Sequence, residues 1–243
     1  MMGFADKANG LLSVFDRRLR RARRAARQFA WLRPCGIKTV LDIGANVGRF
    51  ASKLRLAMPD AMIYAFEPLG DCHRELLTVM SGDARFRAFN IALGETQAEI
   101  TMNRSEHSPA SSLLTMTKLA KELYPHTANL SREQVAVRPL DAVAAELDLQ
   151  SNVLIKVDVQ GYEASVIRGG METFAKASAV LMEVCFQRLY EGQPLFDDLY
   201  ELLRPMGFAF KGFQGKTRTD SDGGALFADA IFLRDGFVDR KTV

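Results

Sequence analysis

The segment VLDIGANVGRF, residues 40–50, constrains the fold of this 243-residue chain more than any other feature. An apolar run leads into a turn that contains Gly44 and Gly48, and the residues after the turn have helical spacing. The two glycines allow a tight turn, and only Ala45 and Asn46 stand at its centre with side chains that a ligand could meet. A strand, a glycine turn and a helix in this order are typical of α/β folds that bind ligands beyond the carboxyl ends of parallel strands.

Beyond position 38, strand-like and helix-like patterns alternate. Apolar runs typical of strands occur at 39–44, 62–68, 86–93, 98–103, 153–159, 179–186 and 225–234, with an edge strand at 207–213. Helical spacing occurs at 49–58, 71–80, 162–176 and 195–205. The alternation predicts an α/β fold with a mostly parallel sheet and helices on both faces. Residues 104–134 are predicted to form an irregular insert, a loop with a short helix, over the sheet edge.

Composition excludes several classes of protein. With 48% hydrophobic and 25% charged residues, the chain can bury a sizeable core. Its three cysteines, Cys35, Cys72 and Cys185, lie far apart, which argues against a disulfide framework and a zinc site and favours a cytoplasmic location. No apolar run approaches the roughly 18 residues that a membrane-spanning helix requires, so we expect no such helix.

The N-terminal part is strongly basic. Residues 1–38 contain ten Lys or Arg and two Asp, whereas the net charge of the whole chain is only +3. We expect a basic amphipathic helix over residues 1–36, the main domain over residues 37–236 and a tail over residues 237–243. Apolar residues recur between the arginines in steps of three and four, which defines an apolar seam: Leu12, Phe15, Leu19, Ala22, Ala26 and Phe29.

Three roles are open for this helix. Residues 11–30 could contact an anionic membrane surface, which would hold the protein peripherally on the inner face of a membrane. The apolar seam could instead pack on the body of the protein or on a second copy of the chain in a homodimer. Nucleic acid is the least favoured partner for the arginines.

Acidic residues follow the first two predicted strands. Asp42 could hold the amides of the turn or a cationic group of a ligand. Glu67 lies 25 positions later, with Pro68 beside it, at about the spacing where an acidic residue binds ribose hydroxyls. A dinucleotide fingerprint would need glycine at positions 46 and 49, which disfavours NAD. A phosphate-free nucleoside with a positive centre, S-adenosylmethionine, suits Asp42 and Asp158 better. The structural alternative is a plain strand-to-helix turn.

Seven motifs spread along the chain resemble one known family. LDIGANVGRF, AFEPLGDCHREL, FNIALG, ASSL, IKVDVQGYEASVIRGG, MEVCFQRLYEG and FADAIFLR occur in the order and with the spacing of the FkbM family of S-adenosylmethionine-dependent methyltransferases, between Thr39 and Arg234. The resemblance implies a Rossmann-like, seven-stranded sheet whose last strand is antiparallel. It also implies O-methylation of a hydroxyl group on a small molecule or glycan, such as a sugar or a polyketide.

The resemblance also implies where the cofactor binds. Asp42, Gly44, Asn46 and Gly48 would line the methionine end, and Glu67 would bind the ribose. Asn90 and Ala92 would lie beside the adenine. Ala45 and Pro68, which adjoin these residues, are included in the expected cofactor site.

Catalysis requires a group that removes the proton of the acceptor hydroxyl. Asp158 ends the fourth strand of the predicted parallel sheet, in the segment KVDVQGYE, and is the leading candidate. Lys156 is expected to be a structural ion-pair partner on the same strand face. His107, in the insert, is a second candidate base or else a solvated loop residue. Ser111 and Ser112 could contact the cofactor or the acceptor, or could simply form turns.

A metal site and other functional classes are the remaining alternatives. Asp158, Glu183 and Asp229 are carboxylates that could converge on magnesium, but their separation in the sequence gives no ligand spacing to test, and we expect no metal. A nucleic-acid methyltransferase that modifies amines usually carries an N/D-P-P-Y/F turn, which DVQGYE is not. A non-catalytic scaffold that binds a nucleoside is disfavoured because the set of motifs is complete.

Overall fold

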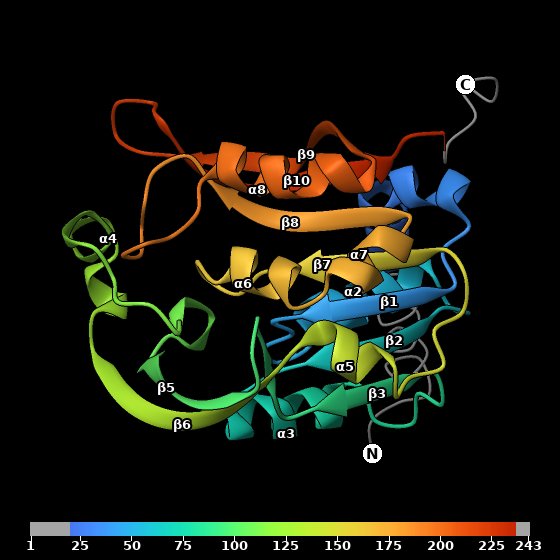
Figure 1. Cartoon of the computed structure of the whole chain (residues 1–243), viewed down its shortest axis with the longest axis horizontal. Helices are drawn as coiled ribbons and strands as arrows, with labels where there is room; N and C mark the ends of the chain where they lie inside the picture. Colours follow the sequence, from blue (N-terminus) through green and yellow to red (C-terminus); the bar gives the residue numbers. More distant parts are fainter. Residues whose placement is uncertain (1–19, 237–243) are drawn as a thin grey trace, which may run out of the picture.

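The computed structural model describes residues 20–236, and its main sheet has seven strands in the order β3-β2-β1-β7-β8-β10-β9 (Figure 1). The strands are β1 (Thr39–Ile43), β2 (Met62–Phe66), β3 (Phe86–Phe89), β7 (Val153–Val157), β8 (Ala179–Cys185), β9 (Phe208–Thr219) and β10 (Ala225–Arg234). The first five strands in this order are parallel, and β10 runs antiparallel to both of its neighbours. The predicted mostly parallel sheet is therefore confirmed, including the edge position of β9.

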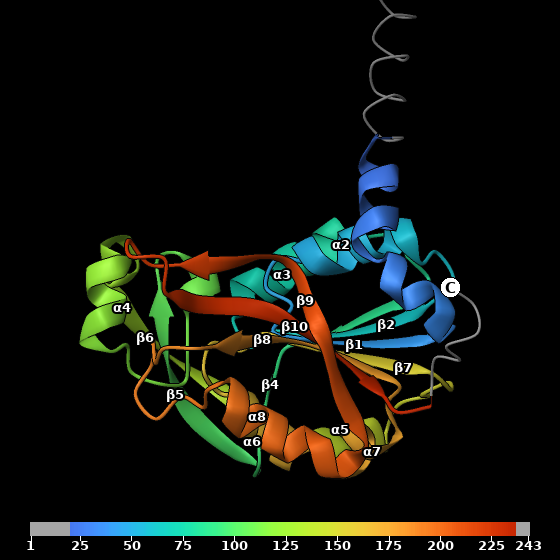
Figure 2. The same ribbon diagram turned by 90° about the horizontal axis from the view of Figure 1, so that it is seen from above.

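Two hydrophobic cores lie on the two faces of this sheet, and helices cover both faces, as predicted (Figure 2). On one face, β1, β2, β7 and β8 pack against α5 (Leu140–Ala144), α6 (Glu163–Arg168), α7 (Met171–Lys176) and α8 (Phe196–Leu203). On the other face, the core includes α2 (Arg49–Ala57), α3 (Gly70–Val79) and η1 (Ala30–Cys35). The central strands β1 and β7 are buried along their whole length, which explains their continuous apolar sequences.

A second sheet of three strands, which the sequence did not predict, stands beside the main one. Its order is β4-β6-β5, from β4 (Ala92–Leu93), β6 (Leu130–Arg138) and β5 (Ala98–Ser105). The prediction of one strand over 86–93 was wrong, because β3 pairs with β2 and β4 pairs with β6. Asn90 lies at the break, and its amide donates to the carbonyl oxygens of Glu67 (2.9 Å) and Pro68 (2.8 Å), so the chain turns there.

The insert is more ordered than its sequence indicated. It contains η2 (Ser108–Ala110), α4 (Lys118–Leu123), η3 (Pro125–Thr127) and the first half of β6. Ser112 Oγ donates to the carbonyl oxygen of Gln160 at 2.6 Å, which ties the insert to the loop after β7. In Figure 1 the arrowhead of β8 points toward the side where α4, β5 and β6 lie. The insert thus stands over the carboxyl end of the parallel strands, where the ligand is expected.

The predicted helix over 162–176 is divided into α6 and α7 at Gly169 and Gly170. A Cβ atom at Gly169 would lie only 1.8 Å from the carbonyl oxygen of Gly94. The chain therefore passes too close to the loop after β4 for any side chain at this position.

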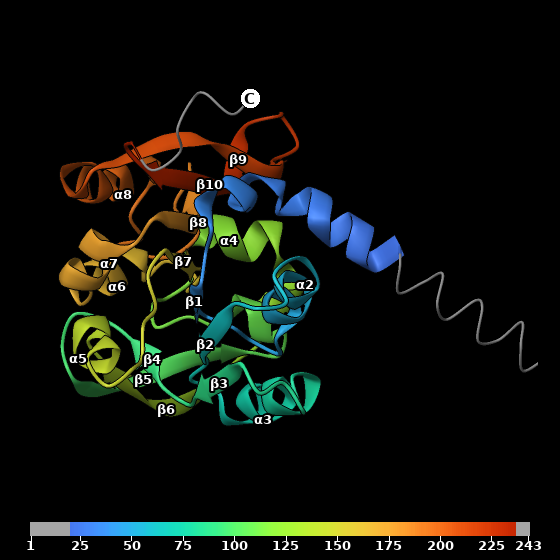
Figure 3. The ribbon, with the colours of Figure 1, turned by 90° about the vertical axis from the view of Figure 1, so that its right-hand side faces the viewer.

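The basic N-terminal segment is helical over residues 20–28 and continues into η1 (Figures 2 and 3). Phe29 is buried and its ring meets that of Phe50 edge to face, with 5.6 Å between centroids. Trp31 Nε1 donates to Gln214 Oε1 on β9 at 2.9 Å. These contacts agree with packing of the segment on the body of the protein. Ala22 and Ala26 of the apolar seam are only half-buried. Leu12, Phe15 and Leu19 of the seam lie outside the described residues.

No helix within residues 20–236 is both long enough and apolar enough to cross a membrane. The expected domain limits at 36 and 236 remain predictions, and the tail lies outside the described residues.

Candidate active site

The turn after β1 is packed tightly against the turn after β7. Gly44 and Asn46 have positive φ angles of 76° and 47°. The amides of Gly44 and Ala45 both donate to the carbonyl oxygen of Phe66 at 3.0 Å. A Cβ atom at position 44 would lie 1.9 Å from the carbonyl oxygen of Asp158, so only glycine fits there. The two strand ends are thereby held side by side with bare backbone between them.

Glu67 is a buried carboxylate that organises the second strand end. One of its oxygens accepts the amide of Asn46 at 2.8 Å, and the other accepts the amide of Leu69 at 2.9 Å. Burial raises the pKa of Glu67 to about 7, although the two amide hydrogen bonds oppose this shift. Each carboxylate oxygen retains a lone pair with which it can accept a further donor.

Beside this carboxylate lies a mainly apolar cavity, which we call the first cavity. It encloses about 660 Å³ between the protein atoms, including space open to solvent. Of the expected cofactor residues, Gly44, Asn46, Glu67, Pro68 and Ala92 line it. The remaining lining comes from the strand ends, the second sheet and the insert, including Phe66, Ile91, Met102, Ser111, Leu113 and Tyr162.

A second cavity, of about 890 Å³ by the same measure, adjoins the first. Gly44, Asn46, Pro109 and Asp158 line both cavities. The second cavity is more polar than the first, and its other lining residues include Gln28, Arg49, Lys53, Lys156, Glu183 and Asp229. Ala45 faces this cavity and not the first. Asp158 thus stands where the two cavities meet.

A hydrogen-bond network holds the carboxylate of Asp158. The amide nitrogen of Gln160 donates to Asp158 Oδ1 at 2.8 Å and to Glu183 Oε2 at 2.7 Å, while Tyr190 Oη donates to Gln160 Oε1 at 3.1 Å. Burial raises the pKa of Glu183 well above its ordinary value, and the charge of Asp158 raises it further. Gln160 thus links the two carboxylates and fixes the orientation of Asp158.

Asp42 lies below the turn and lines neither cavity, contrary to the expectation that it contacts the ligand. Its side chain is fully buried, and its nearest charge is Lys156, with 3.3 Å between Nζ and Oδ1. Lys156 also lies 3.8 Å from Asp158 Oδ2 and donates to the carbonyl oxygen of Gly44 at 2.8 Å. The prediction that Lys156 is an ion-pair partner is confirmed, and Asp42 acts on the turn through it.

Three other candidate residues also lie outside the two cavities. Gly48 is the N-cap of α2, and Asn90 supports the backbone of Glu67 and Pro68 from behind. His107 packs against His126, with 5.9 Å between ring centroids. Its position gives no support to a role as the catalytic base. Ser111 lines the first cavity, and its Oγ accepts the amide of Ser105 at 3.0 Å.

The carboxylates of Asp158, Glu183 and Asp229 face the same cavity. Within residues 20–236, however, no three His, Cys, Asp or Glu side chains are grouped closely enough to hold a metal ion. Burial raises the pKa of Asp229 to about 6, and the charge of Asp158 adds to the shift.

Sequence reasoning did not identify the bridging role of Gln160 or the cavity wall formed by Gln28, Arg49 and Lys53. The segment DVQGYE placed Gln160 close to Asp158, which was the only available signal. The wall residues come from two helices that meet only in the folded chain.

Known proteins match this chain over most of its length. Residues 42–210 match the methyltransferase FkbM domain family. The 2-O-methyltransferase NoeI of Sinorhizobium fredii is 29% identical over 170 residues, which cover 68% of this chain and 70% of NoeI. The AMB antimetabolite synthetase AmbE of Pseudomonas aeruginosa is 29% identical over 198 residues, which cover 70% of this chain but 9% of AmbE.

Similarity to solved structures is more distant. A precorrin-6y C5,15-methyltransferase from Geobacter metallireducens has a TM-score of 0.46 and 9% identity, with 86% of each chain covered. The methyltransferase domain of bacterial CtHen1-C also has a TM-score of 0.46, with 12% identity over 88% of this chain and 97% of that domain. Because the family match spans more than half of the sequence, this chain belongs to the FkbM methyltransferase family.

Proposed function

We propose that this protein transfers a methyl group from S-adenosylmethionine to a hydroxyl group of a small molecule or glycan, with Asp158 as the base. The observation that carries the proposal is the position of Asp158 at the junction of a mainly apolar cavity and a more polar one. O-methyl transfer agrees with the family and with the 2-O-methyltransferase relative.

The residues of the first cavity fit the cofactor. A Cβ atom is excluded at Gly44, so bare backbone faces the cavity, and Glu67 offers a carboxylate with unused lone pairs. We assign the ribose to Glu67, the adenine to the apolar wall near Ala92 and the methionine part to Gly44 and Asn46. When bound, S-adenosylmethionine supplies a methyl group on a positively charged sulfur.

The acceptor is assigned to the second cavity, where its hydroxyl would meet the carboxylate of Asp158. Oδ1 of this carboxylate accepts the amide of Gln160, which fixes the orientation of the group. Oδ2 lies 3.8 Å from Lys156 and is available to accept the proton of the hydroxyl. Glu183 accepts the amide of Gln160 and faces the same cavity, so it can contact the acceptor and help to hold it in place.

Asp158→Asn tests this assignment. With methyl-labelled S-adenosylmethionine and an extract of the native cell as the source of acceptor, we expect labelling to fall by at least about 100-fold. Calorimetry with S-adenosylhomocysteine should give an affinity within about threefold of the wild type, because Asn preserves the shape of the cavity. His107→Gln is the matched control and should label normally. An active Asp158→Asn protein, or an inactive His107→Gln protein, would overturn the assignment of the base.

The rival functions predict different results. A non-catalytic scaffold would bind S-adenosylhomocysteine but label nothing in the extract. A nucleic-acid methyltransferase would lose its labelled product on nuclease treatment, and a dehydrogenase would bind NAD. We expect none of these three outcomes.

We also retain peripheral membrane contact as a proposal for the N-terminal helix. Arg23 and Arg27 are exposed, and they line neither of the two cavities. Such charges are attracted to anionic lipid headgroups. Arg23→Gln/Arg27→Gln should reduce co-sedimentation with phosphatidylglycerol vesicles, and unchanged co-sedimentation would remove the proposal. A homodimer and a cytoplasmic location remain predictions.

A further inference from the structure

A basic groove runs between the N-terminal helix and α2. It is lined by Arg21, Arg24 and Gln28 on the first helix and by Arg49, Ser52 and Lys53 on α2. Gln28, Arg49 and Lys53 also line the second cavity. The groove is therefore the mouth of the cavity that we assign to the acceptor.

The groove is a defined feature of the fold and not a random run of arginines. Arg21, Arg24 and Gln28 are spaced by three and four residues, so they share one helix face. Arg49 and Lys53 are spaced by four residues on α2. The contact between Phe29 and the α2 residue Phe50 holds the two helices in register, and Figures 2 and 3 show them side by side.

The cations of the basic groove form no salt bridges within the described residues, although the charge of Lys53 acts to lower the pKa of Asp229 against the effect of burial. Within residues 20–236, Arg21, Arg24, Arg49 and Lys53 form no salt bridge, whereas Arg55, Arg104, Arg138 and Lys156 each pair with a carboxylate. Four like charges around one groove repel one another, which costs free energy. An anion bound between the two helices would relieve that repulsion.

The inner end of the same space has the opposite character. Asp158, Glu183 and Asp229 face the second cavity, and Lys156 at its base is already paired with Asp42. An anionic group would be repelled there and attracted at the mouth. A ligand that suits both ends is neutral and hydroxylated at its inner end and anionic at its outer end.

We propose that the acceptor carries a phosphate group, held in the basic groove by Arg21, Arg24, Arg49 and Lys53, while its hydroxyl reaches Asp158. This inference rests on the proposed function. Phosphate fits better than a single carboxylate because several oxygens share up to two negative charges and can accept donors from both helices. Arginine is suited to such contacts because its planar fork donates two hydrogen bonds to one group. The phosphate could belong to a soluble ester or to a lipid-linked molecule.

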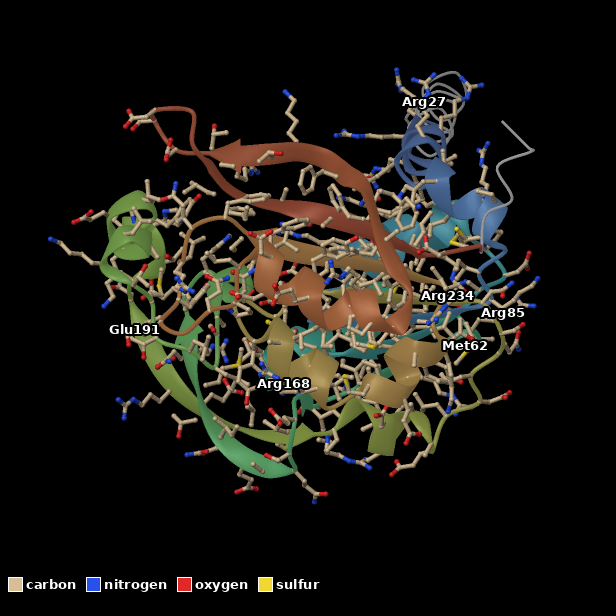
Figure 4. All side chains as sticks on the ribbon, turned by 45° about the horizontal axis from the view of Figure 1, so that its top comes forward. Arg27, Met62, Arg85, Arg168, Glu191 and Arg234 are labelled. Atoms are coloured by element: carbon tan, nitrogen blue, oxygen red, sulfur yellow. The ribbon has the colours of Figure 1, made fainter. Side chains whose placement is uncertain are left out.

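Calorimetry with inorganic pyrophosphate, on the full chain at fixed ionic strength, tests the groove. Arg21→Gln/Arg24→Gln should weaken binding about tenfold or more. The matched control, Arg23→Gln/Arg27→Gln, removes the same charge from positions outside the groove and should change the affinity by less than about twofold. Figure 4 shows Arg27 at the outer edge of the molecule. Equal losses in the two variants, or no binding of pyrophosphate to the wild type, would overturn the proposal.

Competition identifies the source of the phosphate. If it belongs to a lipid-linked molecule, pyrophosphate should displace the protein from phosphatidylglycerol vesicles, and the Arg21→Gln/Arg24→Gln variant should no longer respond. If it belongs to a soluble ester, pyrophosphate should bind without affecting co-sedimentation. Both results support phosphate recognition. If S-adenosylhomocysteine binds and Asp158→Asn abolishes labelling, but the labelled product carries no phosphate, then the groove proposal fails while the proposed function stands.

Discussion

The ionisation of Glu67 should control the affinity for the cofactor. Burial raises its pKa from 4.5 to about 7, so the group is mostly protonated at pH 6 and mostly ionised at pH 8. Only the carboxylate can accept both amides and a ribose hydroxyl together. We therefore expect the affinity for S-adenosylhomocysteine to rise several-fold, up to about tenfold, between pH 6 and pH 8. Calorimetry across this range measures it. In Glu67→Gln the rise should vanish, and a pH dependence that survives this substitution would have another cause.

Lys156 should be essential for stability because it is the charge partner of a fully buried carboxylate. Among the residues that the structure describes, none donates a hydrogen bond to either oxygen of Asp42, so the ion pair with Lys156 is its main compensation. Lys156→Met should lower the free energy of unfolding by about 3–5 kcal/mol, as measured by urea denaturation. Asp42→Asn/Lys156→Met removes both charges and should recover part of that loss. A double variant less stable than Lys156→Met would contradict this account.

At the scale of elements, Arg234 joins the end of β10 to two helices on one face of the sheet. Its guanidinium donates to four main-chain carbonyl oxygens, at the end of α7 and in η4 (Arg204–Met206), at distances of 2.6–3.0 Å. It also lies over the ring of Phe208, with 4.9 Å between Cζ and the centroid. Lysine cannot reproduce this fork, so Arg234→Lys should cost about 1–3 kcal/mol in urea denaturation.

Arg85 provides the control for this substitution, and both side chains are labelled in Figure 4. Arg85 is exposed, so Arg85→Lys should change the stability by less than about 0.5 kcal/mol. Equal effects of the two substitutions would mean that the carbonyl contacts of Arg234 contribute little.

The elements of the main sheet were predictable because its central strands are buried on both faces and are therefore continuously apolar. The second sheet was not, because β6 begins with the mostly exposed and mostly polar residues LSREQ, which resemble a loop. The residues of β4 that pair with β6 lie 45 positions away in the sequence, and those of β5 lie 25–39 positions away. The 162–176 helix breaks at the adjacent Gly169 and Gly170, and the close approach of Gly169 to Gly94 is a long-range contact that no local pattern records.

At the scale of the whole molecule, the two cavities differed in how far the sequence could predict them. Gly44, Glu67 and Asp158 each follow a parallel strand, and the topology brings such residues to one edge. The second cavity also needs the N-terminal helix and β9, which come from opposite parts of the chain and meet through Trp31 and Gln214. The sequence of the N-terminal helix does not indicate that β9 lies beside it, so the second cavity could be identified only in the folded structure.

The N-terminal segment should therefore behave as part of the fold and of the acceptor site. Phe29 is 2% exposed, and its removal should lower the free energy of unfolding by about 3–5 kcal/mol in urea denaturation. Phe29→Ala should also weaken pyrophosphate binding, because the groove loses its register. The affinity for S-adenosylhomocysteine should stay within about twofold, since none of residues 20–42 lines the first cavity.

Leu77→Ala, at an exposed leucine on α3, is the control and should change the stability by less than about 0.5 kcal/mol. If Phe29→Ala were as stable as this control, the segment would be an independent appendage, and its charges could not form a fixed wall of the acceptor cavity. Deletion of residues 1–33 would not separate these possibilities, because it removes Phe29 and Leu32 from the core together with the arginines. Substitution of the arginines tests the charged wall of the cavity, whereas Phe29→Ala tests the packing of the segment, because only Phe29→Ala alters that packing.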